Sequence, residues 1–119
     1  MAGKRILAFD FGASSGRAIL GEYDGTCIRM QEIHRFSNDP VTVNGVFQWD
    51  VLRLFFEIKQ GITKAVHAGG FDAIGIATWG VDFGLVDKKG QLIGNPVHYR
   101  DTRTAGIPEK VYEKIPAEE

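Results

Sequence analysis

The sequence lacks what several classes of protein require. Its 119 residues contain one cysteine, Cys27, which excludes a disulfide within the chain and favours a reducing, cytoplasmic location. No hydrophobic run approaches the roughly 20 residues that span a bilayer, so we expect no membrane insertion. Lysine and arginine are not clustered and the formal net charge is −1, which argues against nucleic acid as a partner. The three histidines stand singly, without the spacing of metal ligands.

What remains is the composition of an ordinary globular protein, 44% hydrophobic and 24% charged. The length is enough for one domain with a core and too short for two. The last four residues, Pro116 to Glu119, place a proline before two acids, which is typical of a helix that is beginning. We therefore expect residues 1–119 to be the front piece of a longer protein.

A turn rich in glycine and serine is the most distinctive local feature. It runs from Asp10 to Arg17 and has the sequence Asp-Phe-Gly-Ala-Ser-Ser-Gly-Arg. Its backbone N–H groups and hydroxyls can converge on one anion, and we expect Gly12 and Gly16 to take positive φ. The same residues also suit a plain hairpin loop, and the Gly-Lys-Ser/Thr of a Walker loop is absent. Both interpretations stay open at this point.

Three strands joined by tight turns are predicted for the first third of the chain. The first is a short apolar run, typical of a strand buried on both faces. Asp24-Gly25 is a strong hairpin turn signal, and Cys27 is expected to pack within the third strand. The alternation of that strand loses its phase at Ile33, which predicts a bulge near Gln31-Glu32. The expected ranges are Ile6–Asp10, Arg17–Tyr23 and Cys27–Phe36.

A helix is predicted after a polar loop, Ser37–Gly45, and a short edge strand at 47–49. Asp50 is a good N-cap, and the helix should run from Val51 to Ala68, before a Gly-Gly pair. Gly61 within it predicts a close approach between helix and sheet. The apolar face expected to pack on the core is formed by Val51, Phe55, Ile58, Ile62 and Ala65.

A run of small apolar residues, Ala73–Thr78, is typical of a strand covered on both faces. Because a helix precedes it, we expect it to lie parallel to an earlier strand through a right-handed crossover. Open α/β sheets bind ligands beyond the carboxyl ends of such strands, where this chain has Trp79–Gly84. The elements expected next are a hairpin around 87–90, a strand at 97–99, and a helix from Thr102 that Pro108 punctuates.

This order of elements is similar to the ribonuclease-H-like, or actin-like ATPase, lobe. We therefore expect an α/β fold that forms part of that lobe: a three-stranded antiparallel meander, helix, parallel strand, hairpin, strand and helix. Within that class the chain resembles the FGGY carbohydrate kinases, and among them the rhamnulokinase branch. The resemblance spans nearly all of residues 1–119 but only the start of a typical member. The matching segments are Asp10–Arg17, Glu32–Phe36, Asn44-Gly45, Trp49–Val51, Thr78–Phe83 and Tyr99–Thr104.

The resemblance implies Mg-ATP-dependent phosphorylation of a ketose, L-rhamnulose at its 1-hydroxyl. Asp10 matches the acid near the Mg²⁺ ion, and Gly80 and Asp82 match the sugar site. The positions that match the ATP-phosphate turn are Gly12, Ala13, Ser14, Ser15, Gly16 and Arg17. The resemblance places the catalytic base beyond residue 119, in a protein of two domains of which 1–119 begins the first. The isolated piece is therefore expected to be inactive, and its partner is the rest of the same chain.

Several residues keep an alternative role. Arg17 suits either a phosphate contact or a surface salt bridge, and Asp82 either a sugar contact or a cap for local backbone. Trp79 is expected to pack rather than to stack on a sugar. Asp101 and Arg103 are expected to position loops rather than to catalyse.

Three other functions remain to be weighed. The enzyme could phosphorylate another ketose, such as L-fuculose or xylulose. An actin-like assembly or sensor domain would share the Asp10 turn but would not need the Trp79–Asp82 loop. A plain interaction module would leave Asp10 buried without a counter-charge, which is costly. For the kinase fragment we also expect an exposed apolar patch where later strands and helices would pack, which invites self-association.

Overall fold

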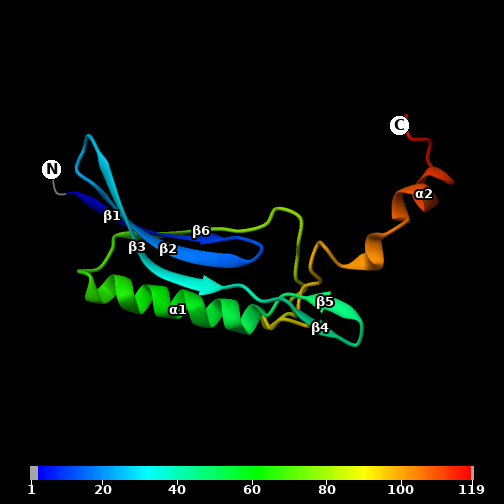
Figure 1. The fold of residues 1–119 in the computed structure, drawn as a ribbon, viewed down its shortest axis with the longest axis horizontal. Coiled ribbons are helices and arrows are strands. Elements are labelled where there is room, and N and C mark those ends of the chain that lie inside the picture. Colours follow the sequence, from blue (N-terminus) through cyan, green and yellow to red (C-terminus); the bar gives the residue numbers. More distant parts are fainter. Residues whose placement is uncertain (1–2, 119) are drawn as a thin grey trace.

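A four-stranded sheet with one long helix across it makes up most of the molecule (Figure 1). The computed structural model describes residues 3–118. Its strands are β1 (Lys4–Phe11), β2 (Ser15–Tyr23), β3 (Ile28–Ser37), β4 (Val41–Val43), β5 (Val46–Gln48) and β6 (Ala73–Ala77). Its helices are α1 (Val51–His67), a 3₁₀ turn at Thr102–Thr104, and α2 (Ile107–Tyr112).

The sheet has the strand order β3-β2-β1-β6, with β6 parallel to β1 and the other neighbours antiparallel. The predicted meander and the predicted parallel crossover strand are therefore confirmed. The pairing of β2 with β3 shifts between Ala18 and Ile19, and Ile33 is the residue left without a partner. The bulge thus lies directly after the position that the sequence indicated. Cys27 is not in β3: it is exposed in the preceding turn, where its N–H donates to Asp24 Oδ1.

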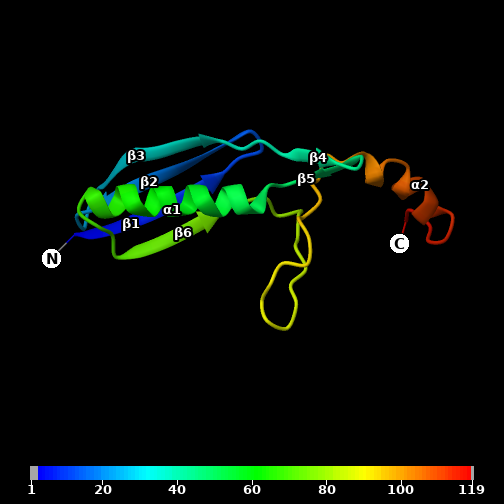
Figure 2. The ribbon, with the colours of Figure 1, turned by 90° about the horizontal axis from the view of Figure 1, so that it is seen from below.

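One face of the sheet forms the core against α1, which packs on β1, β2 and β3 (Figure 2). Leu7, Phe9 and Phe11 point to this face and are almost fully buried, whereas their neighbours Ile6 and Ala8 are exposed. All five residues of β6 are exposed as well. The expectation that the first and the parallel strand are covered on both faces is therefore wrong in this structure, because α1 covers one face only and stops short of β6.

Helix α1 begins and ends as predicted, and Ile58, Ile62 and Ala65 of the predicted face lie in or against the core, but Phe55 does not. The Asp50 side chain accepts the N–H of Arg53 at 3.1 Å, so the predicted N-cap is present. Phe55, expected in the core, is 57% exposed. Gly61 is buried, and a Cβ there would lie 2.6 Å from the Phe9 ring, so the predicted close approach is confirmed. The residues of α1 in or against the core are Leu54, Glu57, Ile58, Gly61, Ile62 and Ala65.

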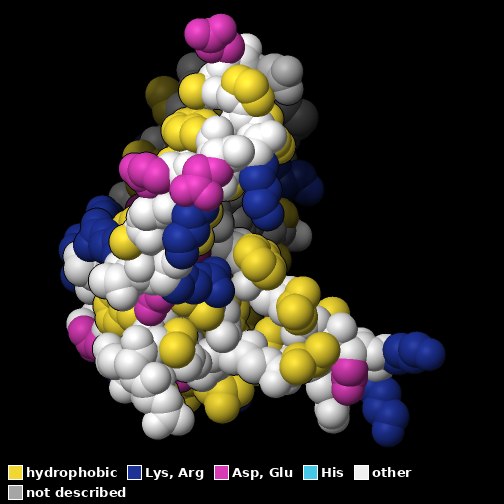
Figure 3. Space-filling model, turned by 90° about the vertical axis from the view of Figure 1, so that its right-hand side faces the viewer, with side chains coloured by type: hydrophobic (Ala, Val, Ile, Leu, Met, Phe, Trp, Pro, Cys, Tyr) yellow, Lys and Arg dark blue, Asp and Glu magenta, His cyan; other side chains and the backbone are white. Residues whose placement is uncertain are grey.

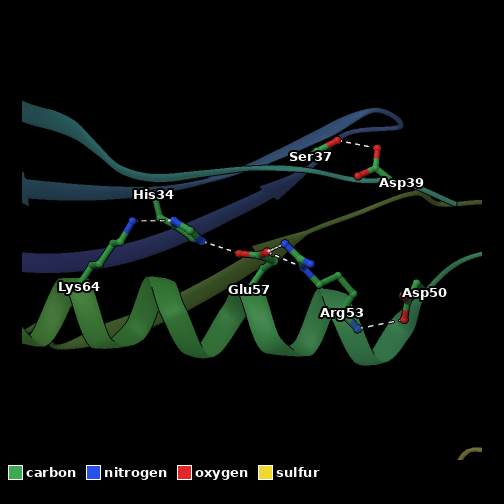
Figure 4. Close-up of polar contacts among 7 residues, drawn as sticks. All are labelled: His34, Ser37, Asp39, Asp50, Arg53, Glu57 and Lys64. Atoms are coloured by element: carbon green, nitrogen blue, oxygen red, sulfur yellow. Dashed lines mark hydrogen bonds and ion pairs between the residues drawn. The ribbon is translucent and has the colours of Figure 1, made fainter.

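A charged residue, Glu57, lies on the buried face of α1 among the apolar residues that pack on the sheet. Glu57 is 3% exposed and accepts hydrogen bonds of 2.7 Å from His34 of β3 and from Arg53 of α1 (Figure 4). Lys64 reaches the other ring nitrogen of His34 at 2.9 Å. Burial by itself would raise the pKa of Glu57, but the hydrogen bonds from His34 and Arg53 outweigh it, so this pKa lies below its usual value. The network joins β3 to α1.

The predicted polar loop before α1 contains a strand. Val41–Val43 pairs with Val46–Gln48 across Asn44 and Gly45, which both have positive φ, as a tight hairpin requires. The later elements are less regular than expected. The hairpin around 87–90 closes through one bridge, Val86 to Leu92, and the strand expected at 97–99 is a single bridge from Val97 to Gln48. The predicted helix from Thr102 is split into the 3₁₀ turn and α2.

The chain is elongated. Its radius of gyration is 19.0 Å, against about 13.5 Å for a compact domain of this length. The segment between β6 and α2 projects from the sheet as a long loop (Figure 2), and α2 lies beyond the β4–β5 hairpin (Figure 1). Hydrophobic side chains lie on the surface at this end of the molecule (Figure 3), and Phe83, Leu85 and Ile93 are each more than 60% exposed. The expected exposed apolar surface is present. No helix within residues 3–118 has the length and apolarity of a membrane-crossing segment.

Candidate functional site

The carboxyl ends of β1 and β6 lie side by side, which brings two predicted site segments to one edge of the sheet. Asp10 pairs with Ala77 in the parallel register, so the turn after β1 and the loop after β6 leave the sheet together. The Phe11 and Trp79 rings are 6.3 Å apart between centroids. The adjacency expected from the crossover topology is therefore observed, and the turn and the loop can act on one ligand.

The turn between β1 and β2 is held by hydrogen bonds to its backbone. The N–H of Gly12 donates to the Ser15 carbonyl at 2.8 Å, and Asn38 binds the carbonyls of Gly12 and Ser14. Ala13 and Ser14 form the tip, where the Ser14 side chain is exposed. A small, polar, solvent-facing tip of this kind leaves N–H groups and hydroxyls available to an anion.

The glycines of the turn serve close packing rather than unusual dihedrals. Neither Gly12 nor Gly16 has positive φ, so that expectation is wrong. A Cβ on Gly12 would lie 2.8 Å from the Ser15 carbonyl oxygen, and one on Gly16 would lie 2.1 Å from the Phe36 ring. Both distances are far below contact, so the turn fits over the core only without side chains at these positions.

Asp10, the penultimate residue of β1, lies on the face that α1 leaves open. Its side chain is 60% exposed and lies 3.5 Å from Arg17 Nε. The argument that Asp10 would be buried without counter-charge is therefore wrong, and it no longer counts against an interaction module. The described residues hold no group of three His, Cys, Asp or Glu side chains that could cage a metal ion. A lone exposed carboxylate still fits Mg²⁺, which is commonly held by one or two carboxylates together with substrate phosphates.

An aromatic stack organises the loop after β6. The Trp49 ring lies between those of Trp79 and His98, at centroid distances of 3.7 and 3.9 Å. Trp49 is 1% exposed, and its indole N–H donates to the Asp82 carboxylate at 2.5 Å. Trp79 thus packs, as predicted, and Asp82 meets a side-chain donor instead of capping local backbone.

Asp82 and Trp79 line a hollow of about 170 Å³ beside this stack. The indole nitrogen of Trp79 is buried, and within residues 3–118 no acceptor takes its hydrogen. Asp82 is thus the charged group in a largely apolar wall, an environment in which a carboxylate can accept hydrogen bonds from hydroxyls. Gly80 is exposed at the side of the loop, and neither it nor residues 12–17 line this hollow.

Two polar residues of the 98–103 segment fix its path. His98 is 2% exposed, and its Nδ1 accepts the N–H of Arg100 at 3.0 Å. Burial lowers the pKa of His98 and the nearby Asp82 carboxylate opposes this, so the neutral ring is favoured. The Asp101 carboxylate accepts the N–H groups of Phe47 and Arg103 at 2.7 and 2.8 Å, which lower its pKa. Asp101 thus ties this segment to β5, the positioning contact expected from the sequence.

Sequence reasoning missed three residues that build this region: Asn38, Trp49 as the centre of a stack, and His98. The register of β2 and β3, in which Ser37 pairs with Ser15, places Asn38 opposite Ser14, but the sequence around Asn38 signals only a bend. The stack depends on the course of residues 78–100, which have no regular pattern to predict it.

Solved structures with the same arrangement are sugar kinases. A gluconate kinase from Lactobacillus acidophilus has a TM-score of 0.67 at 15% identity, over 93% of this chain and 24% of its own. A xylulose kinase from the same organism has a TM-score of 0.66 at 16% identity, and the match covers 92% of this chain and 24% of the kinase. A xylulose kinase from Rhodospirillum rubrum has a TM-score of 0.61 at 15% identity, and the match covers 97% of this chain and 25% of the kinase. The chain thus spans about a quarter of each structure, and identities this low show the fold alone.

The class that this fold defines is the actin-like ATPase lobe of sugar kinases, which confirms the predicted fold class. A model of the N-terminal domain of one carbohydrate kinase family matches residues 5–119. The chain belongs to the FGGY family of carbohydrate kinases.

Proposed function

We propose that this chain is the N-terminal part of the first ribonuclease-H-like domain of a two-domain kinase that phosphorylates L-rhamnulose at its 1-hydroxyl with Mg-ATP. The observation that carries the proposal is the parallel pairing of β1 with β6, which brings the glycine-serine turn and the Trp79–Asp82 loop to one edge. A nucleotide-binding assembly domain needs the turn only. The pairing of a phosphate-type turn with a polyol-type hollow favours a sugar kinase.

In this proposal the turn from Gly12 to Arg17 holds the ATP phosphates, through its backbone N–H groups, its two serine hydroxyls and the Arg17 guanidinium. Asp10 would hold the Mg²⁺ ion directly or through water, and the ion would neutralise charge on the transferring phosphate. Arg17 Nε lies 3.5 Å from Asp10, so a cation held by Asp10 would leave the Arg17 guanidinium available to a phosphate.

Asp82 and Gly80 contact the sugar. The Asp82 carboxylate accepts from ketose hydroxyls, while the indole N–H of Trp49 fixes its orientation. The exposed backbone of Gly80 allows close approach of the ligand. The choice of L-rhamnulose rests on the sequence resemblance, since the solved relatives are gluconate and xylulose kinases and fold alone does not choose among sugars.

The catalytic base and the second lobe lie outside residues 1–119 in this proposal. The solved kinases are about four times as long as this chain, and the exposed apolar face of the sheet and β6 suits packing against such a remainder. Self-association of the isolated 119-residue chain through that face stays a prediction. The proposal extends to a cytoplasmic location, which a single exposed cysteine supports.

A ketose panel tests the function. We expect the full-length enzyme with Mg-ATP to release ADP on L-rhamnulose at a kcat/KM at least about tenfold above that on L-fuculose or D-xylulose. Residues 1–119 alone should form no sugar phosphate. A preference for xylulose would overturn the substrate, and ATP binding without turnover on any ketose would favour a sensor domain.

Replacing Asp82 with asparagine should raise the ketose KM by about 10- to 100-fold, the loss of a hydrogen bond to a charged group. Asparagine still accepts from Trp49, so the stack should stay intact and the KM for ATP unchanged. Asp87→Asn is the matched control, because the Asp87 side chain accepts the N–H groups of Lys89 and Gln91 within its own turn and does not line the hollow. An unchanged ketose KM in Asp82→Asn would remove Asp82 from the sugar site.

A further inference from the structure

Asn38 stands directly after β3 and reaches the turn between β1 and β2 with two donors. Its backbone N–H donates to the Ser14 carbonyl at 3.0 Å, and its side-chain amide donates to the Gly12 carbonyl at 2.8 Å. The residue is 4% exposed, whereas its neighbours Ser37 and Asp39 are exposed. A buried polar side chain is retained where its hydrogen bonds are made, and both bonds here end on one turn.

These two bonds fix the direction of two peptide groups. A trans peptide is planar, and its C=O and N–H point in opposite directions. The described chain has no cis peptide bond. Since the Gly12 and Ser14 carbonyls point toward Asn38, the N–H groups of Ala13 and Ser15, which belong to the same peptides, point to the other side. Within residues 3–118 no backbone or side-chain oxygen accepts the Ala13 N–H.

We infer that Asn38 is a positioning residue for phosphate binding: it aims the Ala13 and Ser15 N–H groups at the anion by holding the carbonyls behind them. This inference rests on the proposed function, in which the turn binds the phosphates of ATP. Donors that already point at the anion do not have to reorganise when it binds. Asn38 should therefore increase the affinity for the nucleotide and leave the affinity for the sugar unchanged.

The chemistry of the side chain is specific. A carbonyl oxygen needs a donor, and the amide of asparagine supplies one at the required reach. Aspartate has the same shape but presents an acceptor to the Gly12 carbonyl, which repels it. Alanine leaves that carbonyl without its partner and frees the peptide to rotate.

The test uses the full-length enzyme and Mg-ATP as the probe. We expect Asn38→Ala to raise the Kd for Mg-ATP by about tenfold and Asn38→Asp by more, with the ketose KM within twofold of wild type. Asp39→Ala is the matched control, since the exposed Asp39 side chain accepts the Ser37 hydroxyl and makes no hydrogen bond to the turn among the described residues, and it should leave the Kd unchanged. Folded Asn38→Ala with a wild-type Kd would overturn the inference.

A second measurement does not depend on any variant folding. In the wild-type enzyme with ¹⁵N-labelled alanine and serine, Mg-ATP should slow hydrogen exchange at the Ala13 and Ser15 amides more than at Ser14. Equal protection at all three amides would overturn the role of Asn38 while leaving the proposed function in place. No Mg-ATP binding by the wild type would overturn both.

Discussion

Replacing Gly16 with alanine is expected to lower the free energy of unfolding by about 3 kcal/mol, the upper end of what overpacking a core costs. The added Cβ would lie 2.1 Å from the Phe36 ring, deep inside contact distance. Phe36 is 7% exposed and packs edge-on against Phe11, at 5.5 Å between centroids, so the ring has little room to move. Urea unfolding followed by tryptophan fluorescence measures the effect.

Gly21→Ala is the matched control, because Gly21 lies in the same strand and its Cβ would meet ordinary contacts at 3.8 Å. Its unfolding free energy should change by less than about 1 kcal/mol. If packing is the cause, Gly16→Ala combined with Phe36→Leu should be more stable than the sum of the two single changes indicates. A Gly16→Ala protein as stable as Gly21→Ala would show that the ring does not restrict this position.

The local elements of the fold could be predicted because each has its signal within a few residues. Asp24-Gly25 marks the β2–β3 turn, and Asp50 marks the start of α1. Burial could not be predicted in the same way. The apolar run of β6 indicated a strand covered on both faces, yet Ile74 and Ile76 are 46% and 53% exposed. The hydrophobicity of a strand indicates that its side chains can be buried. Whether they are buried depends on which other elements pack against that strand.

The face of α1 shows a second limit of the pattern. Spacing of apolar residues placed Phe55 inward, but the buried position is Glu57. A carboxylate reaches the core side of a helix only when partners compensate it, and one of those partners, His34, comes from another element. A pattern within one segment does not contain that information.

The candidate site was predictable as far as topology determines it. Parallel strands present their carboxyl ends at the same edge of a sheet, which predicts that the Asp10 turn and the Trp79 loop lie together, as the pairing of β1 with β6 shows. Topology does not predict which side chains fix the conformation of each loop. The turn is held by Asn38, from a segment whose sequence signals only a bend. The hollow beside Asp82 is lined by Trp49, which precedes α1, and by Trp79, which stacks on it.

Replacing Glu57 with alanine is expected to lower the unfolding free energy by about 3 kcal/mol. This is the low end for breaking a buried ion pair, because Arg53 is 60% exposed and regains water, while His34 is only 11% exposed and loses its partner. Glu32→Gln is the matched control: its pair with Arg35 lies on the surface, and its loss should leave the unfolding midpoint within error. If the two changes lowered the unfolding free energy equally, the Glu57 network would contribute no more than a surface ion pair.

The same network predicts a dependence on pH whose sign follows from the pKa of Glu57. That pKa lies below its usual value of 4.5 in the folded protein, so the folded state holds the proton less tightly than the unfolded chain. The stabilisation is therefore complete above about pH 5.5 and is lost as the pH falls through 4.5 toward the folded pKa. Other carboxylates contribute to acid unfolding, so the measured quantity is the difference between wild type and Glu57→Gln. That difference should shrink steadily between pH 6 and pH 3, and a constant difference would mean that Glu57 is not charged in the fold.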